Sequence, residues 1–276
     1  MNPQRRDALD RVGKTVAVAA AIAAGMIRPS DLYAAWNQRA FDAKKLNEAM
    51  DTLGVGQPVQ SGDVVVTAPD IAENGALVPL EIVSNIPGTE SLAVFVDRNP
   101  WPFIARFDVS RGAAAFVALR VRVGESSPVR VVAQAGGKSY VGVHEKVQVT
   151  VGGCAGDTSS AAPAQAADAG GAPKPIRIRA TVAGDVANVR VLISHPMENG
   201  LRKDAAGKPV PEHFVQNVVV QLNGQTVLEG ELGRSVSVNP LIGFKLKGAK
   251  TGDKVTVRWQ DNKGMSRTDE AVVGAS

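Results

Sequence analysis

Alternation of apolar and polar residues dominates most of this chain. Val147, Val149 and Val151 alternate with polar residues, and Val255 and Val257 lead the same pattern near the C-terminal end. A period of two residues places successive side chains on opposite faces of a β-strand. The pattern therefore predicts an all-β protein, with further strands at 64–67, 76–83, 92–96, 103–109, 119–123, 129–133, 176–182, 218–222 and 226–228.

One segment follows a helical period instead. Leu46, Met50 and Leu53 recur at the i, i+4, i+7 spacing of a single helix face, with charged residues between them. Gly54 follows directly, and glycine commonly ends a helix. We therefore predict a short helix over 41–53 before the strands begin.

Turn signals separate the strand segments. Asn223-Gly224 between two strand-like runs is typical of a tight hairpin, and Asp261-Asn262-Lys263-Gly264 indicates another turn. Many short strands joined by such turns favour antiparallel β-sandwiches of the Ig-like type. The chain has a single cysteine, so packing alone would hold these sandwiches together, without the disulfide of antibody domains.

A change in composition divides the strand-rich sequence. Residues 155–175 consist mainly of Ala, Gly, Ser, Pro, Asp and Gln and hold no large hydrophobic residue. Such a segment cannot bury enough apolar area to offset the entropy lost on ordering, so we interpret it as a flexible linker. The sequence predicts two Ig-like antiparallel β-sandwich domains, at 36–154 with the N-terminal helix and at 176–276.

The first 35 residues have the pattern of an export signal. Arg5-Arg6 precede an uncharged stretch rich in Ala and Val at 15–27, which is too short to span a bilayer. Paired arginines with a mildly hydrophobic core are typical of a twin-arginine signal, so we predict a signal peptide at 1–35 and a periplasmic location. The alternative is an amphipathic N-terminal helix that remains attached.

The charge distribution argues against nucleic acid as a partner. The formal net charge is +4, and residues 1–29 hold five Arg or Lys against two Asp. A nucleic-acid-binding protein normally has a clustered basic surface, which the rest of the sequence lacks. We expect neither a nucleic-acid partner nor a membrane association.

The candidate functional residue is Cys154. It follows a strand directly, precedes the linker, and lies among Gly152, Gly153, Ala155 and Gly156. Glycine widens the accessible backbone conformations, so we predict a slim, flexible arm that carries one thiol. The histidines lack metal-ligand spacing and no base is identifiable near the thiol, which favours a carrier over a metal site or an enzyme. An incidental exposed cysteine is the remaining alternative.

Several motifs resemble two known families. Residues 73–156 are similar to SoxY, through Glu73-Asn74-Gly75-Ala76-Leu77-Val78-Pro79, Asp97-Arg98-Asn99-Pro100 and the Gly-Gly-Cys arm. Residues 176–273 resemble SoxZ, through His195-Pro196-Met197-Glu198, Arg202-Lys203-Asp204, Pro211-Glu212-His213-Phe214, Asn239-Pro240 and Asp261-Asn262-Lys263-Gly264. The resemblance identifies the chain as a SoxY–SoxZ fusion, whose separate counterparts form the sulfur carrier of the thiosulfate-oxidising Sox system.

The resemblance implies a function without catalysis or a cofactor of its own. The haem protein SoxAX would join thiosulfate to the sulfur of Cys154, and the dimanganese enzyme SoxB would then hydrolyse off sulfate. A molybdenum–haem sulfane dehydrogenase would oxidise the remaining sulfur. The resemblance also implies that the SoxY-like and SoxZ-like halves pack together, and the thiol of Cys154 allows a disulfide dimer.

Four further residues are candidates for partner docking. Arg98 and Trp101 lie in a predicted turn, and His195 and His213 lie in predicted loops. Aromatic residues and arginines are enriched at interfaces, but loop packing is the alternative for all four.

One departure from the SoxY pattern bears on function. Ala155 stands where the family has a glycine, and the chain continues beyond it, so the arm is tethered at both ends. The alternatives to a thiosulfate carrier are a related carrier of another ligand, associated with a quinoprotein dehydrogenase, and a sulfurtransferase acting alone.

Overall fold

The computed structural model describes residues 36–153 and 172–275. The predicted signal peptide, Cys154, Ala155, Gly156 and most of the predicted linker lie outside the described residues. Within the described ranges, no helix has both the length and the apolar character needed to cross a membrane.

The predicted N-terminal helix is divided in two. Helix α2 spans Gln38–Asp42 and helix α3 spans Leu46–Thr52. Between them, Ala43 and Lys45 have extended backbone conformations, which interrupts the helical hydrogen bonds. The C-terminal boundary agrees with the prediction, because Gly54 follows α3 with a φ of 65°.

Strands occupy most of the remaining described residues. In the first half they are β1 Val59–Gln60, β2 Val64–Thr67, β3 Ile71–Asn74, β4 Val78–Ser84, β5 Thr89–Val96, β6 Phe103–Asp108, β7 Ala113–Val121, β8 Ser127–Ala135 and β9 Lys138–Val151, with a 3-10 turn, η2, at Gly75–Leu77. In the second half they are β10 Arg177–Ala183, β11 Val186–Leu192, β12 Val215–Leu222, β13 Gln225–Leu232, β14 Leu241–Lys247, β15 Lys254–Asp261, β16 Ser266–Val272 and β17 Gly274–Ala275. The all-β, Ig-like sandwich prediction is confirmed.

The predicted Asn223-Gly224 turn is present between β12 and β13. Both residues have positive φ, 50° and 82°, as the tight turns of two-residue hairpins require. By contrast, the sequence patterns did not identify six strands, β1, β3, β11, β14, β16 and β17. In β16, alternate residues are exposed and the others are only half-buried, so the strand lacks a buried apolar face.

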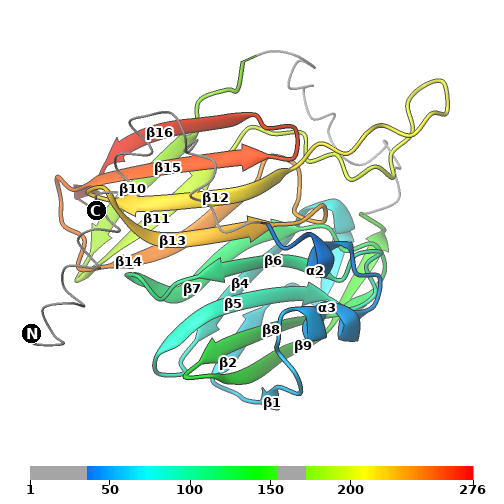
Figure 1. The fold of residues 1–276 in the computed structure, drawn as a ribbon, viewed down its shortest axis with the longest axis horizontal. Coiled ribbons are helices and arrows are strands. Elements are labelled where there is room, and N and C mark those ends of the chain that lie inside the picture. The colour runs from blue at the N-terminus through cyan, green and yellow to red at the C-terminus, as the bar shows by residue number, and fades with distance from the viewer. Residues whose placement is uncertain (1–35, 154–171, 276) are drawn as a thin grey trace, which may run out of the picture. The chain divides into compact units, whose positions relative to one another are not determined.

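Within the described residues the strands form two sheets, and both sheets run through the two halves of the chain. One has the order β1-β9-β8-β5-β6-β13-β12-β15-β16, with β3 also on β9, and the other has the order β17-β10-β11-β14-β7-β4-β2. The halves join where β6 pairs with β13 and where β7 pairs with β14, both antiparallel. Figure 1 shows β6 and β13 side by side. The halves therefore share continuous sheets rather than meeting face to face.

Glycines lie at both joints between the halves. Gly230 of β13 is paired with Phe107 of β6, and a Cβ on Gly230 would lie 3.1 Å from the Phe107 ring. Gly243 of β14 is paired with Ala118 of β7, and its Cβ would lie 3.2 Å from that of Ala118. Glycine at these two positions therefore leaves room for the Phe107 ring and the Ala118 methyl group of the first half.

Candidate functional site

The backbone that leads to Cys154 is held by a neighbouring strand end. Gly153 donates its N–H to the carbonyl of Val123 at 2.9 Å, and Val123 donates its N–H to the carbonyl of Gly75 at 2.7 Å. Three segments distant in sequence therefore meet at one point. We call Gly75, Val123, Gly124, Gly152 and Gly153 the arm root.

The glycines of the arm root are required by close approach of backbones. A Cβ on Gly153 would lie 2.1 Å from the carbonyl oxygen of Gly75, and one on Gly152 would lie 2.3 Å from the carbonyl oxygen of Gly124. A Cβ on Gly75 would lie 2.4 Å from the oxygen of Val123. Gly152 and Gly153 thus have a packing role that the sequence-based expectation of a flexible arm did not include.

Asn99 ties the same strand end to the preceding turn. Its side-chain Nδ2 donates to the carbonyl of Arg122 at 2.7 Å, and its Oδ1 accepts the N–H of Gly124 at 2.8 Å. The residue is only 3% exposed. Sequence reasoning missed Asn99, although its position in the motif Asp97-Arg98-Asn99-Pro100 was a usable signal, because asparagine commonly bonds backbone in turns.

Arg98, a predicted docking residue, lies exposed beside the arm root. Its backbone N–H donates to the hydroxyl of Ser127, and its Nη1 donates to the carbonyl of Ser126 at 3.1 Å. The Ser126 hydroxyl in turn accepts the N–H of Val149 in β9. The placement is compatible with contact to a partner, but the structure does not test that prediction.

Trp101, the docking candidate in the same turn as Arg98, is half-buried and packs against charged side chains of other segments. The Lys44 ammonium lies 4.0 Å from the centre of its ring, and the Arg234 guanidinium lies 5.0 Å from it. Arg234 belongs to the second half and also forms ion pairs with Asp42 and Glu212, each at 2.8 Å. Burial, followed by the charge of Arg234, lowers the pKa of Lys44. Trp101 therefore lies at a junction between the N-terminal helices and the second half.

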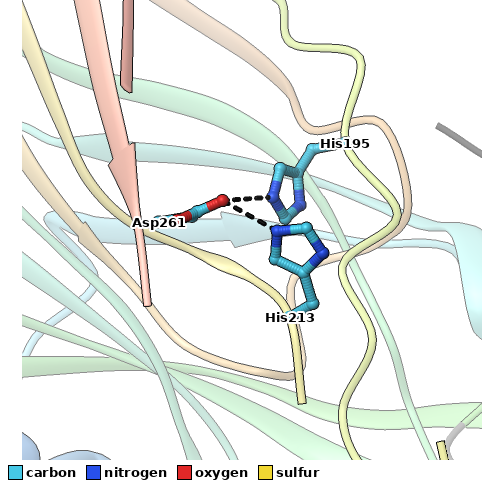
Figure 2. Close-up of side chains that lie close together, drawn as sticks. All are labelled: His195, His213 and Asp261. Atoms are coloured by element: carbon cyan, nitrogen blue, oxygen red, sulfur yellow. Dashed lines mark hydrogen bonds and ion pairs between the residues drawn. The ribbon is translucent and has the colours of Figure 1, made fainter. Parts of the chain in front are cut away.

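His195 and His213 converge on one carboxylate. Figure 2 shows both rings pointing toward Asp261, with Nε2 of His195 at 3.3 Å and Nε2 of His213 at 2.8 Å from the same oxygen, Oδ2. His195 is 2% exposed and the Asp261 side chain is fully buried, whereas His213 is half-buried. We call these three residues the His–Asp cluster.

The hydrogen bonds of His195 fix the tautomer of its neutral ring. Nδ1 of His195 accepts the N–H of Met197 at 3.1 Å, so the hydrogen of the neutral ring lies on Nε2 and is donated to Asp261. Burial lowers the pKa of His195, although the bond to Asp261 opposes this. Oδ1 of Asp261 accepts the backbone N–H groups of Lys263 and Met265.

The pKa of Asp261 itself reflects two opposing effects. Burial alone raises it, but the hydrogen bonds from the two histidines and the two backbone N–H groups outweigh burial and hold it below its ordinary value. Asp261 is therefore a carboxylate that accepts four hydrogen bonds. Such a group stabilises the surrounding loops as long as it stays ionised.

The arrangement does not suit a metal ion, although three potential ligand atoms lie within 4.8 Å of one another. A metal would need a lone pair on the ring nitrogen that faces Asp261. In His195 that nitrogen carries the hydrogen, because the other nitrogen is an acceptor for Met197. The cluster is therefore best described as a hydrogen-bonded support for loops, which the separation of its members along the chain had hidden.

The arm root can position a thiol but contributes no acid or base. None of its five described residues, Gly75, Val123, Gly124, Gly152 and Gly153, has an ionisable side chain. General acid–base catalysis needs a titratable group within hydrogen-bond reach of the reacting atoms. Chemistry at the next residue, Cys154, would thus depend on groups that the arm root does not supply.

Comparison with protein families gives two matches along the chain. Residues 49–154 match the model of the sulfur oxidation protein SoxY, and residues 176–272 match that of the sulphur oxidation protein SoxZ. Comparison with curated proteins gives no match.

The solved structures include a relative of substantial sequence identity. The sulfur carrier protein SoxY from Chlorobium limicola f thiosulfatophilum is 36% identical, and the match covers 39% of this chain and 97% of that one, with a TM-score of 0.34. A β-glycosidase from Bacteroides vulgatus is 11% identical, covering 82% of this chain and 26% of that one, with a TM-score of 0.25.

Proposed function

The chain belongs to the SoxY and SoxZ families, with one domain of each in a single polypeptide, and on that premise we propose that it carries sulfur covalently on Cys154. It is a sulfur carrier of the Sox system. Beyond this family assignment, we propose the attachment residue, the substrate and the partner enzymes.

The main observation in support of the proposal is the way the arm root holds the backbone that leads to Cys154. The SoxY match ends at residue 154, directly after Gly153, whose N–H is bound to the carbonyl of Val123. A fixed residue on one side and a linker-like sequence on the other suit a thiol that is presented to other proteins. A buried cysteine would instead be expected within a strand or helix of the core.

The proposed cycle uses the carrier only as the site of attachment. Thiosulfate joins the Cys154 sulfur through a new S–S bond, and the two electrons released pass to the haem partner, SoxAX. Water then cleaves the terminal S–S bond in the SoxB site, which releases sulfate and leaves a persulfide. A sulfane dehydrogenase then withdraws electrons from the persulfide sulfur, whose new oxygen atoms come from water, and a second hydrolysis in the SoxB site releases sulfate and returns the free thiol. The carrier is not an enzyme in this scheme, and twin-arginine export would place it in the periplasm with these partners.

Intact-protein mass spectrometry tests the attachment. The reduced full chain is incubated with thiosulfate, SoxAX and an electron acceptor, and its mass is measured without reductant. We expect an increase equal to one thiosulfonate group, reversed by reductant and absent in Cys154→Ser. The chain with thiosulfate alone should stay unmodified, because forming the S–S bond requires an oxidant.

Two results would contradict the proposal. Either Cys154→Ser still gains the adduct, or the wild-type chain stays unmodified with a SoxAX preparation that loads another SoxY–SoxZ carrier. The second result would favour a carrier of a different ligand, such as one associated with a quinoprotein dehydrogenase.

A further inference from the structure

The strand end that holds the arm root is also held by the SoxZ domain. Val121, the last residue of β7, forms an isolated bridge with Val236. The next residue, Arg122, donates its N–H to the carbonyl of Ser235 at 2.7 Å. Residues 120–122 therefore contact SoxZ backbone, and the next two residues, Val123 and Gly124, belong to the arm root.

The side chain of Arg122 adds a second connection. Its Nη1 donates to the carbonyl oxygen of Met197 at 2.7 Å and to that of Arg234 at 2.9 Å. Both acceptors belong to loops of the SoxZ domain, and the side chain is half-buried. Hydrogen bonds with an ionised donor are stronger than neutral ones, so this side chain fixes the spacing between the strand end and the two loops.

Met197 is itself held in place by the His–Asp cluster. It is fully buried and has a φ of 48°, in the left-handed region that non-glycine residues rarely adopt. Its N–H donates to Nδ1 of His195, and its sulfur accepts the N–H of Val215 at 3.3 Å. The neighbouring Glu198 forms a backbone bridge with His213. A strained backbone conformation persists only where several surrounding contacts hold it, as the contacts of Met197 and its neighbour do.

From these contacts we propose that Arg122 is a positioning residue for the carrier arm, through which the His–Asp cluster of the SoxZ domain sets the position of the arm root in the SoxY domain. The path runs from Asp261 through His195 and Met197 to Arg122, and then from Val123 to Gly153. The inference rests on the proposed function, since it gives the SoxZ domain a defined part in presenting Cys154. In this arrangement the SoxZ domain positions the arm root and takes no part in the reactions at Cys154.

Amide hydrogen exchange in the full chain tests the proposal. The exchange rate of the Gly153 N–H reports the bond to Val123, and that of Val94, in the centre of β5, reports global stability. Arg122→Met keeps the apolar stem but removes the side-chain hydrogen bonds to the carbonyls of Met197 and Arg234. We expect Gly153 to exchange at least about tenfold faster in this variant, since each lost bond is made by a charged donor.

Two further variants provide the controls. Arg120→Met changes the same residue type two positions earlier, at an exposed position of β7, and should leave the exchange rate of Gly153 unchanged. Arg122→Lys retains a charged donor and should restore part of the protection at Gly153. Unchanged exchange at Gly153 in Arg122→Met, with Val94 still protected, would overturn the proposal. So would equal acceleration of Gly153 and Val94 in Arg122→Lys, which would indicate a general loss of stability.

The experiment is separate from the test of the carrier function. Exchange at Gly153 is measured on unloaded protein and does not depend on any sulfur adduct. If the wild-type chain takes no adduct, the carrier function fails whatever the Arg122 variants do. If it takes the adduct but Gly153 does not respond to Arg122→Met, the positioning role fails alone.

Discussion

At the scale of single residues, the glycines before Cys154 serve backbone packing. Glycine in a mobile segment is usually explained by its conformational freedom. Here the relevant property is the missing Cβ, because Gly153 lies against the carbonyl of Gly75 and Gly152 lies against that of Gly124. The two explanations make different predictions about alanine at these positions.

Gly153→Ala should destabilise the protein, whereas Gly62→Ala should not. The new Cβ at 153 would lie 2.1 Å from a backbone oxygen that cannot rotate away, and overpacking of this kind costs about 1–3 kcal/mol. Gly62 has no atom within 4 Å of its ideal Cβ, so we expect a change within about 0.5 kcal/mol there. Urea unfolding of both variants measures the difference, and equal midpoints would argue that the glycine serves flexibility alone.

At the scale of elements, the N-terminal segment shows how one buried side chain overrides a helical pattern. Phe41 of α2 stacks on Phe103 of β6 with ring centres 4.2 Å apart and is 1% exposed. The apolar face of α3 begins only at Leu46, after the extended residues that separate the two helices. The extended residues after Phe41 thus end the first helix before the apolar face of α3 begins, and the single predicted helix over 41–53 is replaced by two short ones.

Phe41→Ala should detach α2 from the sheet and lower stability strongly. Removing a fully buried phenylalanine costs about 3–5 kcal/mol. Phe116→Ala is the matched control, because that ring is half-buried and lies beneath the Lys245 ammonium at 4.2 Å. Thermal unfolding should show a clearly larger loss for Phe41→Ala, and a similar loss for both variants would mean that α2 contributes little to the fold.

At the scale of the whole described chain, the two domains form one compact unit with shared sheets. The β6–β13 and β7–β14 pairings make both sheets continuous, and Arg234 adds ion pairs to Asp42 and Glu212. Backbone pairing along two pairs of strand edges buries polar groups that each domain alone would expose. On this basis we expect the predicted linker mainly to raise the local concentration of one domain near the other.

Cutting the linker should therefore leave the domains associated. A protease site inserted within residues 155–171 allows the purified chain to be cleaved after folding. We expect the two fragments to elute together in gel filtration and to unfold in one cooperative transition, the same result that we expect of the uncut chain. Separate elution of folded fragments at micromolar concentration would show that the shared sheets alone do not hold the halves together.

The sequence by itself determined the features that local patterns encode. Period-two alternation gave the β class and most strands, Asn223-Gly224 gave a hairpin, and the motifs led to the SoxY and SoxZ families. These features depend on residues close together in the chain, where side-chain direction and turn conformation follow from a few neighbouring positions.

Only the tertiary structure decided how distant segments meet. His195 and Asp261 are 66 positions apart, and no spacing rule links them or predicts the tautomer that disfavours a metal ion. The same holds for Gly75 against Gly153 and for Arg122 against Met197, because strand edges and backbone approach depend on the register of whole sheets. The sequence thus pointed to the cysteine as the site, while the fold showed what holds the backbone that leads to it.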